Sequence, residues 1–394
     1  MFTLRPYQQQ AVEKLLWSRN LEGADVCVLP PGAGKSLIIA ELARKLGKPV
    51  LILQPTKEIL EQNLSKLKHY VADCEIGVYS ASVGRKDINT YTFATIQSIY
   101  KKPEDFAHFD FVIIDECHLV NHKNLNTMFM QFLVSIGNPK VVGLSATPYR
   151  LDIAYEKTSD GFIAHTATKL INRMGRQRFW HRIVFNITLD ELVKDGYLAE
   201  LEYIDHSIVD HKNLPTNKSE SDFDLGEFDE LVHKEEQKIF KAIAHARELS
   251  KHTLVFCSSV EQAEWLSAQY FSAAVVSAKT KKKDREKIIA GFRNGGIQMV
   301  FNVGVLTTGF DFPELDGIVM IRPTRSMALY YQMAGRGVRV SPNKKACTVI
   351  DVSGNVKALG RISSIKLVKR ELWELESETG SWHNTPLYSF KVIK

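Results

Sequence analysis

The stretch Val26–Leu37, VCVLPPGAGKSL, decides the fold class of this chain. It opens with a short apolar run, Val26 to Leu29, of the kind expected for a buried parallel strand. A glycine-containing loop follows, and residues 37–43, LIIAELA, have the pattern of a helix. A strand, a glycine loop and a helix in this order form the context of a phosphate-binding P-loop.

The loop residues suit a nucleotide and its metal ion. Gly32 and Gly34 let the backbone curl so that its N–H groups point at phosphate oxygens, and the helix N-terminus adds partial positive charge there. Lys35 can reach the β- and γ-phosphates, and the Ser36 hydroxyl can ligate Mg²⁺. The strict P-loop pattern has a glycine where this chain has Leu29. The alternative is a glycine turn that carries Lys-Ser by coincidence.

Composition limits the class of protein. A length of 394 residues predicts two domains, and a hydrophobic content of 44% is ordinary for a globular protein. The net charge of +6 permits a polyanionic partner. None of the five cysteines has C-x-x-C spacing, so the sequence predicts neither a zinc site nor a disulfide framework. No apolar run is long enough to cross a bilayer, and we expect a soluble, cytoplasmic protein.

Further buried strands are predicted at residues 50–53, 91–94, 109–114 and 141–144, with helices between them. Such strands form an open parallel sheet that binds ligands at the carboxyl ends of its strands. Two of these ends carry polar residues that suit a phosphate, Pro55 and Thr56 after one strand and Thr95 and Gln97 after the other. Ordinary βα turns are the alternative at both places.

Asp115 and Glu116 follow the strand 109–114 directly. Two adjacent carboxylates at the end of a buried strand indicate chemistry rather than packing. One of them can hold Mg²⁺ through its water shell, and the other can accept a proton from an attacking water. The alternative is an acidic cap on the following helix.

The middle of the chain is less informative. Four arginines between 173 and 182 surround Phe179 and Trp180, and they predict either contacts with a nucleic-acid backbone or a solvated basic face with two core aromatics. Residues 209–236 are polar and predict a linker or surface loop. The sequence predicts the domain boundary between about residues 190 and 235.

A second α/β pattern begins near residue 253 and contains the segment 332–339, QMAGRGVR. We expect Arg336 and Arg339, three residues apart, to share a helix face. Their guanidinium groups either stabilise negative charge on a transferring phosphoryl group or form an inert surface pair. Residues 365–375 predict a helix, and the segment 361–394 shows no chemistry.

Nine motifs together resemble those of superfamily-two helicases of the DEAD/DEAH-box, restriction-helicase-like kind. In chain order they are LRPYQQ (4–9), PPGAGKS (30–36), QPTKEILEQN (54–63), TFATIQS (92–98), DECH (115–118), SATP (145–148), VFCSS (255–259), TTGFD (307–311) and QMAGRGVR (332–339). Within the superfamily they look most like the RadD group of bacterial DNA-repair helicases. The RadD group carries a cysteine-rich region after the second domain, and the sequence predicts that this chain ends without one.

The resemblance implies an α/β fold of two RecA-like domains, each an open, mostly parallel sheet with helices on both faces. It places the first domain at 1–195, an inter-domain segment at 196–235, the second domain at 236–360 and a tail at 361–394. ATP and Mg²⁺ are the implied cofactors, with ATP in the cleft between the domains. The implied nucleotide-binding residues are Arg5, Gln8, Gly32, Ala33, Gly34, Lys35, Ser36, Leu37, Gly309 and Asp311.

The other implied roles follow the same motifs. Ser36 and Asp115 hold the metal, Glu116 is the catalytic base, and Gln332, Arg336 and Arg339 approach the γ-phosphate. His118 links the ATP site to the motif of Ser145 and Thr147, and these three are the implied coupling residues. The implied strand contacts are Pro55, Thr56, Thr95, Gln97, Thr307 and Thr308.

The function predicted from these motifs is an ATP-dependent helicase or translocase that acts on DNA, as a monomer, in DNA repair or metabolism. An RNA helicase and an ATP-gated nucleic-acid clamp remain as alternatives, because the motifs contact phosphate and sugar rather than bases. No strand-separating insertion is evident in the sequence, so translocation is favoured over unwinding.

Overall fold

The computed structural model describes residues 3–158, 161–171, 179–218, 221–307, 310–371 and 373–382. The chain divides into two compact units. The first contains Met1–Tyr149 and Leu170–Ile187, and the second contains Arg150–Lys169 and Thr188–Lys394.

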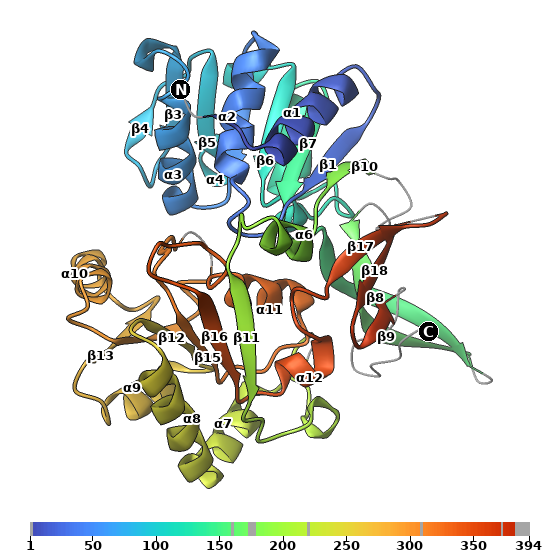
Figure 1. Ribbon diagram of the computed structural model, residues 1–394. Coiled ribbons are helices and arrows are strands. Elements are labelled where there is room, and N and C mark those ends of the chain that lie inside the picture. Colours follow the sequence, from blue (N-terminus) through green and yellow to red (C-terminus); the bar gives the residue numbers. More distant parts are fainter. Residues whose placement is uncertain are drawn as a thin grey trace. The chain divides into compact units, whose positions relative to one another are not determined.

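The first unit is built on an eight-stranded sheet with the order β10-β1-β7-β6-β2-β5-β3-β4 (Figure 1). All pairings are parallel except that of β3 with β4, which is antiparallel. The strands are β1 (Ala24–Val28), β2 (Val50–Gln54), β3 (Ile76–Ser80), β4 (Arg85–Lys86), β5 (Tyr91–Thr95), β6 (Phe111–Asp115), β7 (Lys140–Ser145) and β10 (Trp180–Asn186).

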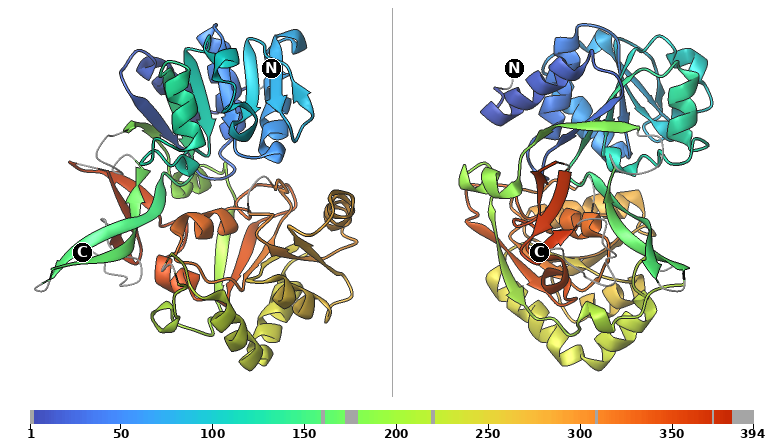
Figure 2. Two further views of the ribbon diagram at one scale, coloured as in Figure 1. Left: turned by 180° about the vertical axis from the view of Figure 1, so that it is seen from behind. Right: turned by 90° about the vertical axis from the view of Figure 1, so that its right-hand side faces the viewer.

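Helices cover this sheet, and that cover explains the sequence pattern of its strands. Every residue of β1, β2, β5 and β6 is buried, as continuous apolar runs require when both faces of a parallel sheet are covered. Helix α2 packs between α1 and α3, and α4 packs against α5 (Figures 1 and 2). The helices are α1 (Pro6–Ser18), α2 (Lys35–Leu46), α3 (Lys57–Leu67), α4 (Ile96–Ile99) and α5 (Met128–Ser135), with short 3₁₀ turns η1 (Asp73–Glu75), η2 (Pro103–Phe106) and η3 (Cys117–Leu119).

The second unit contains a six-stranded, wholly parallel sheet with the order β11-β16-β15-β12-β14-β13. Its strands are β11 (Glu200–Asp205), β12 (Thr253–Phe256), β13 (Ala273–Ser277), β14 (Met299–Val303), β15 (Gly317–Met320) and β16 (Ala346–Asp351). Its helices are α6 (Leu189–Lys194), α7 (Leu225–Lys234), α8 (Glu236–Leu249), α9 (Val260–Ser267), α10 (Lys282–Arg293), α11 (Met327–Ala334) and α12 (Asn355–Leu359), with a 3₁₀ turn η5 (His211–Asn213). Both units therefore have the predicted α/β architecture of RecA-like domains.

Two small sheets were not predicted. Strands β8 (Tyr149–Thr158) and β9 (Gly161–Leu170) form a two-stranded ribbon, and β17 (Lys366–Lys369), β18 (Trp373–Ser377) and β19 (Gly380–Trp382) form a three-stranded sheet. The prediction of a helix over 365–375 was wrong. In that segment Leu367 pairs with Leu375 across a hairpin, so cross-strand pairing overrides the local pattern.

The prediction of a loop over 209–236 was wrong for residues 225–234. Helix α7 forms there, with the Asp224 side chain accepting hydrogen bonds from the N–H groups of Gly226 and Glu227 at its N-terminus. Phe228 and Val232 bury this helix in the hydrophobic core of the second unit. Within the described part of the chain, no helix combines the length and the apolar character needed to cross a membrane.

Candidate functional site

The loop between β1 and α2 has the backbone geometry of a phosphate cradle. Gly32 and Gly34 have φ angles of 77° and 81°, in the left-handed region that favours glycine. A Cβ on Gly34 would lie 2.4 Å from Nε2 of Gln8, so a side chain there would displace the Gln8 amide from the Ala33 carbonyl. Helix α2 begins at Lys35, and its first N–H groups face the same loop.

The start of α1 is tied to this loop. The Gln8 side chain donates from Nε2 to the Ala33 carbonyl at 3.0 Å and accepts from the Arg5 N–H at 2.9 Å. The Tyr7 hydroxyl donates to the same Ala33 carbonyl at 2.8 Å. Tyr7 was not singled out from the sequence, although it lies inside the motif that contains Arg5 and Gln8. The start of α1 therefore holds the P-loop by the main-chain carbonyl of Ala33.

Strand β6 delivers Asp115 and Glu116 to the same edge of the sheet. Glu116 has a φ of 49°, which is rare for a residue other than glycine and is typical of functional positions. Its Oε1 lies 3.9 Å from Nζ of Lys35. Gly143 of the neighbouring strand β7 leaves room for Cys117, the residue after Glu116, because a Cβ on Gly143 would lie only 2.5 Å from Cβ of Cys117. The structure thus brings the lysine and both carboxylates together.

Asp115 is held in place by a residue that the sequence analysis missed. Asn63, a buried residue of α3, donates from Nδ2 to Asp115 Oδ2 at 2.8 Å, and the Glu116 N–H donates to Oδ1 at 3.0 Å. Burial raises the pKa of Asp115 to about 6, with a further contribution from the negative charge of Glu116. Asn63 is the last residue of the quoted segment QPTKEILEQN, and its spacing gave no sign of this contact.

The donor set fits a divalent cation. Two adjacent carboxylates face one ammonium group, Lys35, so a cation added beside Asp115 would be attracted by a net negative charge. The Ser36 hydroxyl, at the start of α2, is the hard oxygen ligand that Mg²⁺ prefers. The residues present therefore fit Mg²⁺.

His118 connects Glu116 with the SATP segment. Its Nδ1 lies 2.8 Å from Ser145 Oγ, 3.5 Å from Thr147 Oγ1 and 3.4 Å from Glu116 Oε2. Ser145 Oγ also accepts from the Thr147 N–H at 3.0 Å. The three predicted coupling residues form one buried network with the predicted base.

The predicted strand-contact residues of the first unit lie at strand ends, as expected. Thr56 is the N-cap of α3, with its side chain accepting from the Ile59 N–H at 3.4 Å, and Pro55 precedes it. Gln97 is exposed, whereas Thr95 is buried and its hydroxyl lies 2.9 Å from Ser98 Oγ. The Thr95 hydroxyl is thus engaged inside the protein.

In the second unit the two predicted arginines lie beyond α11, so the expectation that they share a helix face was wrong. The helix ends at Ala334, and the turn from Gly335 carries them onward. Arg336 Nη1 donates to the Phe310 carbonyl at 2.7 Å, and Arg339 forms an ion pair with Asp311. Burial lowers the pKa of Arg339 to about 10.

Three other predicted positions belong to this unit. Gln332 is half-buried near the end of α11. The Thr307 hydroxyl donates to the Gly304 carbonyl at 3.5 Å. Thr308 and Gly309 lie outside the described residues.

A polar network that the sequence did not reveal holds the turn before α11. Asp222 accepts from the Arg325 N–H at 2.8 Å and from the Thr324 hydroxyl at 3.1 Å. Asn355 accepts from the Thr324 N–H at 3.0 Å and donates to the Arg322 carbonyl at 2.9 Å. The network fixes where the helix that precedes the arginines begins.

The basic cluster near residue 180 has a structural role where it is described. Arg182 Nε lies 2.7 Å from one oxygen of the fully buried Asp25, and Lys140 Nζ lies 2.6 Å from the other. Trp180 is fully buried in the core. Arg173, Arg176 and Arg178 lie outside the described residues.

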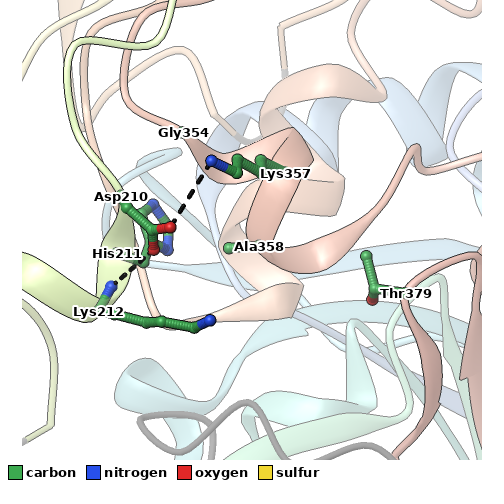
Figure 3. Close-up of a pocket in the computed structure, with 7 residues that line it drawn as sticks. All are labelled: Asp210, His211, Lys212, Gly354, Lys357, Ala358 and Thr379. Atoms are coloured by element: carbon green, nitrogen blue, oxygen red, sulfur yellow. Dashed lines mark hydrogen bonds and ion pairs between the residues drawn. The ribbon is translucent and has the colours of Figure 1, made fainter.

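A separate cavity of about 190 Å³ lies in the second unit (Figure 3). It is lined by Asp210, His211, Lys212, Gly354, Lys357, Ala358 and Thr379. Asp210 pairs with Lys357 at 3.6 Å on its wall. The lining residues are none of those predicted for ATP or nucleic acid, so this cavity is not the candidate site.

Two family models match two separate stretches of the chain. Residues 1–150 match the family "Type III restriction enzyme, res subunit", and residues 235–341 match "Helicase conserved C-terminal domain". These matches, together with the two RecA-like folds, make the chain similar to superfamily-two helicases. They agree with the predicted motif order, and the match to the RadD group in particular stays a prediction.

Individual relatives are distant. The "Putative ATP-dependent helicase IRC3" of Saccharomyces cerevisiae is 26% identical over 93% of this chain and 53% of its own length. The "DNA 3'-5' translocase XPB2" of Sulfurisphaera tokodaii is 23% identical over 85% of this chain and 78% of its own. The solved structure "ATP-dependent Type ISP restriction-modification enzyme LlaBIII bound to DNA" superposes with a TM-score of 0.62 at 17% identity, over 89% of this chain and 28% of that one. The chain spans about half the length of the yeast relative.

Proposed function

We propose that this superfamily-two helicase couples ATP hydrolysis to movement along, or remodelling of, a DNA strand. The observation that supports it is the convergence of Lys35, Asp115 and Glu116 at the carboxyl edge of one parallel sheet, with His118 linking them to Ser145 and Thr147. Coupling of hydrolysis to strand movement needs a path out of the hydrolytic centre, and the hydrogen bonds of His118 to the end of β7 provide one. The proposal places one ATP between the two RecA-like domains.

Lys35 and Glu116 have complementary parts in the reaction. The Lys35 ammonium binds the β- and γ-phosphates, which separates it from Glu116 and leaves that carboxylate free to accept a proton from the attacking water. The left-handed backbone at Glu116 directs this carboxylate away from the line of β6. Ser36 and Asp115 would hold Mg²⁺, which would supply positive charge beside the phosphates.

The remaining motif residues complete the cycle that we propose. Arg5 and Gln8 contact adenine and Asp311 the ribose, while Gln332, Arg336 and Arg339 approach the γ-phosphate. The arginine contacts seen in this structure, with the Phe310 carbonyl and with Asp311, must then open. Loss of the γ-phosphate removes their new partner, so each hydrolysis event returns them to these contacts.

The segments around Pro55, Thr95 and Thr307 hold one strand by its backbone in this proposal. DNA is favoured over RNA because the relative XPB2 is described as a DNA 3'-5' translocase. The resemblance to the RadD group extends the proposal to DNA repair or DNA metabolism, and to action as a monomer.

The decisive experiment compares three rates, those of ATP hydrolysis, translocation and unwinding, on single-stranded DNA, duplex DNA and RNA. We expect single-stranded DNA to stimulate hydrolysis and to support translocation. Stimulation by RNA alone would favour an RNA helicase. Tight strand binding with hydrolysis but without movement would favour an ATP-gated clamp. Hydrolysis that no nucleic acid stimulates would refute the proposal.

A further inference from the structure

Lys344 occupies an unusual place in the second unit. Its ammonium donates hydrogen bonds to three backbone carbonyls, those of Gly337 at 2.8 Å, Leu315 at 2.9 Å and Pro313 at 3.0 Å. An ammonium group has three donors, so these bonds use its full capacity. Lys344 lies in the loop before β16, outside every motif that the sequence analysis quoted.

This arrangement is costly to build. Burial lowers the pKa of Lys344, which shows that the protein environment disfavours its charge. The compensation comes from carbonyl dipoles, and charge-assisted hydrogen bonds of this kind are stronger than those between neutral groups. Its neighbour Lys345 is exposed. Two adjacent lysines therefore have different environments, and only Lys344 has its charge directed inward.

The three carbonyls belong to the two segments that carry the proposed nucleotide contacts. Pro313 and Leu315 follow Asp311, and Gly337 lies between Arg336 and Arg339. The side-chain contacts of Arg336 with the Phe310 carbonyl and of Arg339 with Asp311 join the same two segments. Those contacts must open when the arginines turn to phosphate, whereas the bonds of Lys344 involve only main-chain acceptors and can persist.

The turn is also packed tightly from its other side. A Cβ on Gly337 would lie 2.5 Å from Sγ of Cys347 in β16 and 3.1 Å from Cδ2 of Leu201 in β11. The sheet and the Lys344 ammonium thus confine the backbone between the two arginines. A confined backbone lets the two guanidinium groups change partners without a displacement of the turn itself.

We propose that Lys344 is a positioning residue for Arg336 and Arg339, which holds their turn in register with the Asp311 segment throughout the ATPase cycle. This inference rests on the proposed function, because it assigns Lys344 a part in the same hydrolysis. Lys344 touches no substrate and acts through the two arginines.

The test compares Lys344→Met with the matched control Lys345→Met in the full-length chain. We expect the Lys344 variant to lose about tenfold to hundredfold in DNA-stimulated turnover, because misplacement of a catalytic group by about 1 Å has an effect of that size. Its affinity for a fluorescent ATP analogue in the absence of DNA should change little, since the P-loop contacts are intact. The Lys345 variant should match the parent in both measurements.

A double-mutant cycle separates positioning from general stability. If Lys344 acts through the arginines, adding Lys344→Met to Arg339→Ala should change turnover by much less than it does in the parent. If the fold-losses in turnover of the two substitutions multiply in the double variant, the inference is overturned. A parent-like rate in Lys344→Met would overturn it as well. If Lys344→Met does not fold, the same cycle is run with Lys344→Arg, whose planar fork cannot reproduce three diverging bonds. Absence of ATPase activity in the unchanged chain would refute the proposed function. An active chain in which neither lysine variant lowers the rate would refute only the inference about Lys344.

Discussion

Replacing Asp25 by asparagine should destabilise the first unit strongly. The Asp25 side chain is fully buried and binds two cations, Lys140 at 2.6 Å and Arg182 at 2.7 Å. Asparagine keeps the shape but loses the charge, and its amide group points a donor toward one of the two cations. The variant therefore leaves positive charge in the protein interior with no carboxylate to balance it.

The magnitude follows from how exposed each cation is. Breaking a buried ion pair by removing one partner costs about 3–5 kcal/mol. The Lys140 side chain is only 11% exposed, so its contribution is close to the full one. Arg182 is 35% exposed, and water can screen its charge. Lys140 also keeps its hydrogen bonds to the carbonyls of Leu21 and Gly23. We therefore expect a loss near the lower end, about 3 kcal/mol.

Differential scanning calorimetry of the full-length chain measures this loss. For a unit of this size about 3 kcal/mol lowers the unfolding temperature by about 6–12 °C. Asp110→Asn, at an exposed position of the same unit, is the matched control and should leave the temperature unchanged. An Asp25→Asn transition within about 1 °C of the parent would refute the reasoning, because it would mean that water already solvates the two cations.

Three further predictions concern nucleotide, pH and salt. Glu116→Gln should bind a fluorescent ATP analogue like the parent but hydrolyse little ATP. Lys35→Ala should lose binding, because only the lysine contacts phosphate in the ground state. Hydrolysis of ATP at the parent rate by Glu116→Gln would show that Glu116 is not the base. Burial lowers the pKa of His211 to about 4, below its ordinary value of 6.5. Between these two pH values His211 binds a proton in the unfolded chain but not in the folded one. The stability that neutral, buried His211 contributes above pH 6.5 is therefore lost as the pH falls toward 4. His211→Gln, which keeps a donor for the Ser353 carbonyl, should show a shallower loss of stability over that interval in urea titrations, and an unchanged slope would contradict the burial argument. Affinity for single-stranded DNA should fall steeply as salt rises and depend little on base sequence, and a binding constant insensitive to salt would argue against backbone contacts.

Local sequence patterns predicted well the strand ends that carry the candidate site. The strand–loop–helix around Lys35 and the position of Asp115 and Glu116 at the end of β6 were confirmed, because continuous apolar runs and left-handed glycines are determined by near neighbours. The α/β pattern of both units followed from the same local signals, and their RecA-like fold followed from the resemblance of the motifs. The errors arose where an apolar run was short. Residues 365–375 pair as a hairpin, a choice that the pattern alone does not decide.

The placement of the two arginines shows a different limit. Their spacing predicted a shared helix face, but the chain leaves the helix at Ala334. Gly335 and Gly337 are poor helix formers, and the helix ends at the first of them. Gly337 also packs against Cys347 of β16, so the turn must fit that contact.

What the sequence by itself determined are the elements and the chemical groups at their ends: the P-loop, the two carboxylates, and the polar residues that follow the parallel strands. Only the tertiary structure decided which side chains orient those groups. Asn63 lies 52 residues before the Asp115 carboxylate that it holds, and Lys140 and Arg182 meet on Asp25 from β7 and β10. Lys344 reaches three carbonyls from a loop without a motif. The physical reason is that hydrogen bonds and ion pairs depend on distances in the folded chain, whereas patterns in the sequence record only neighbours along it.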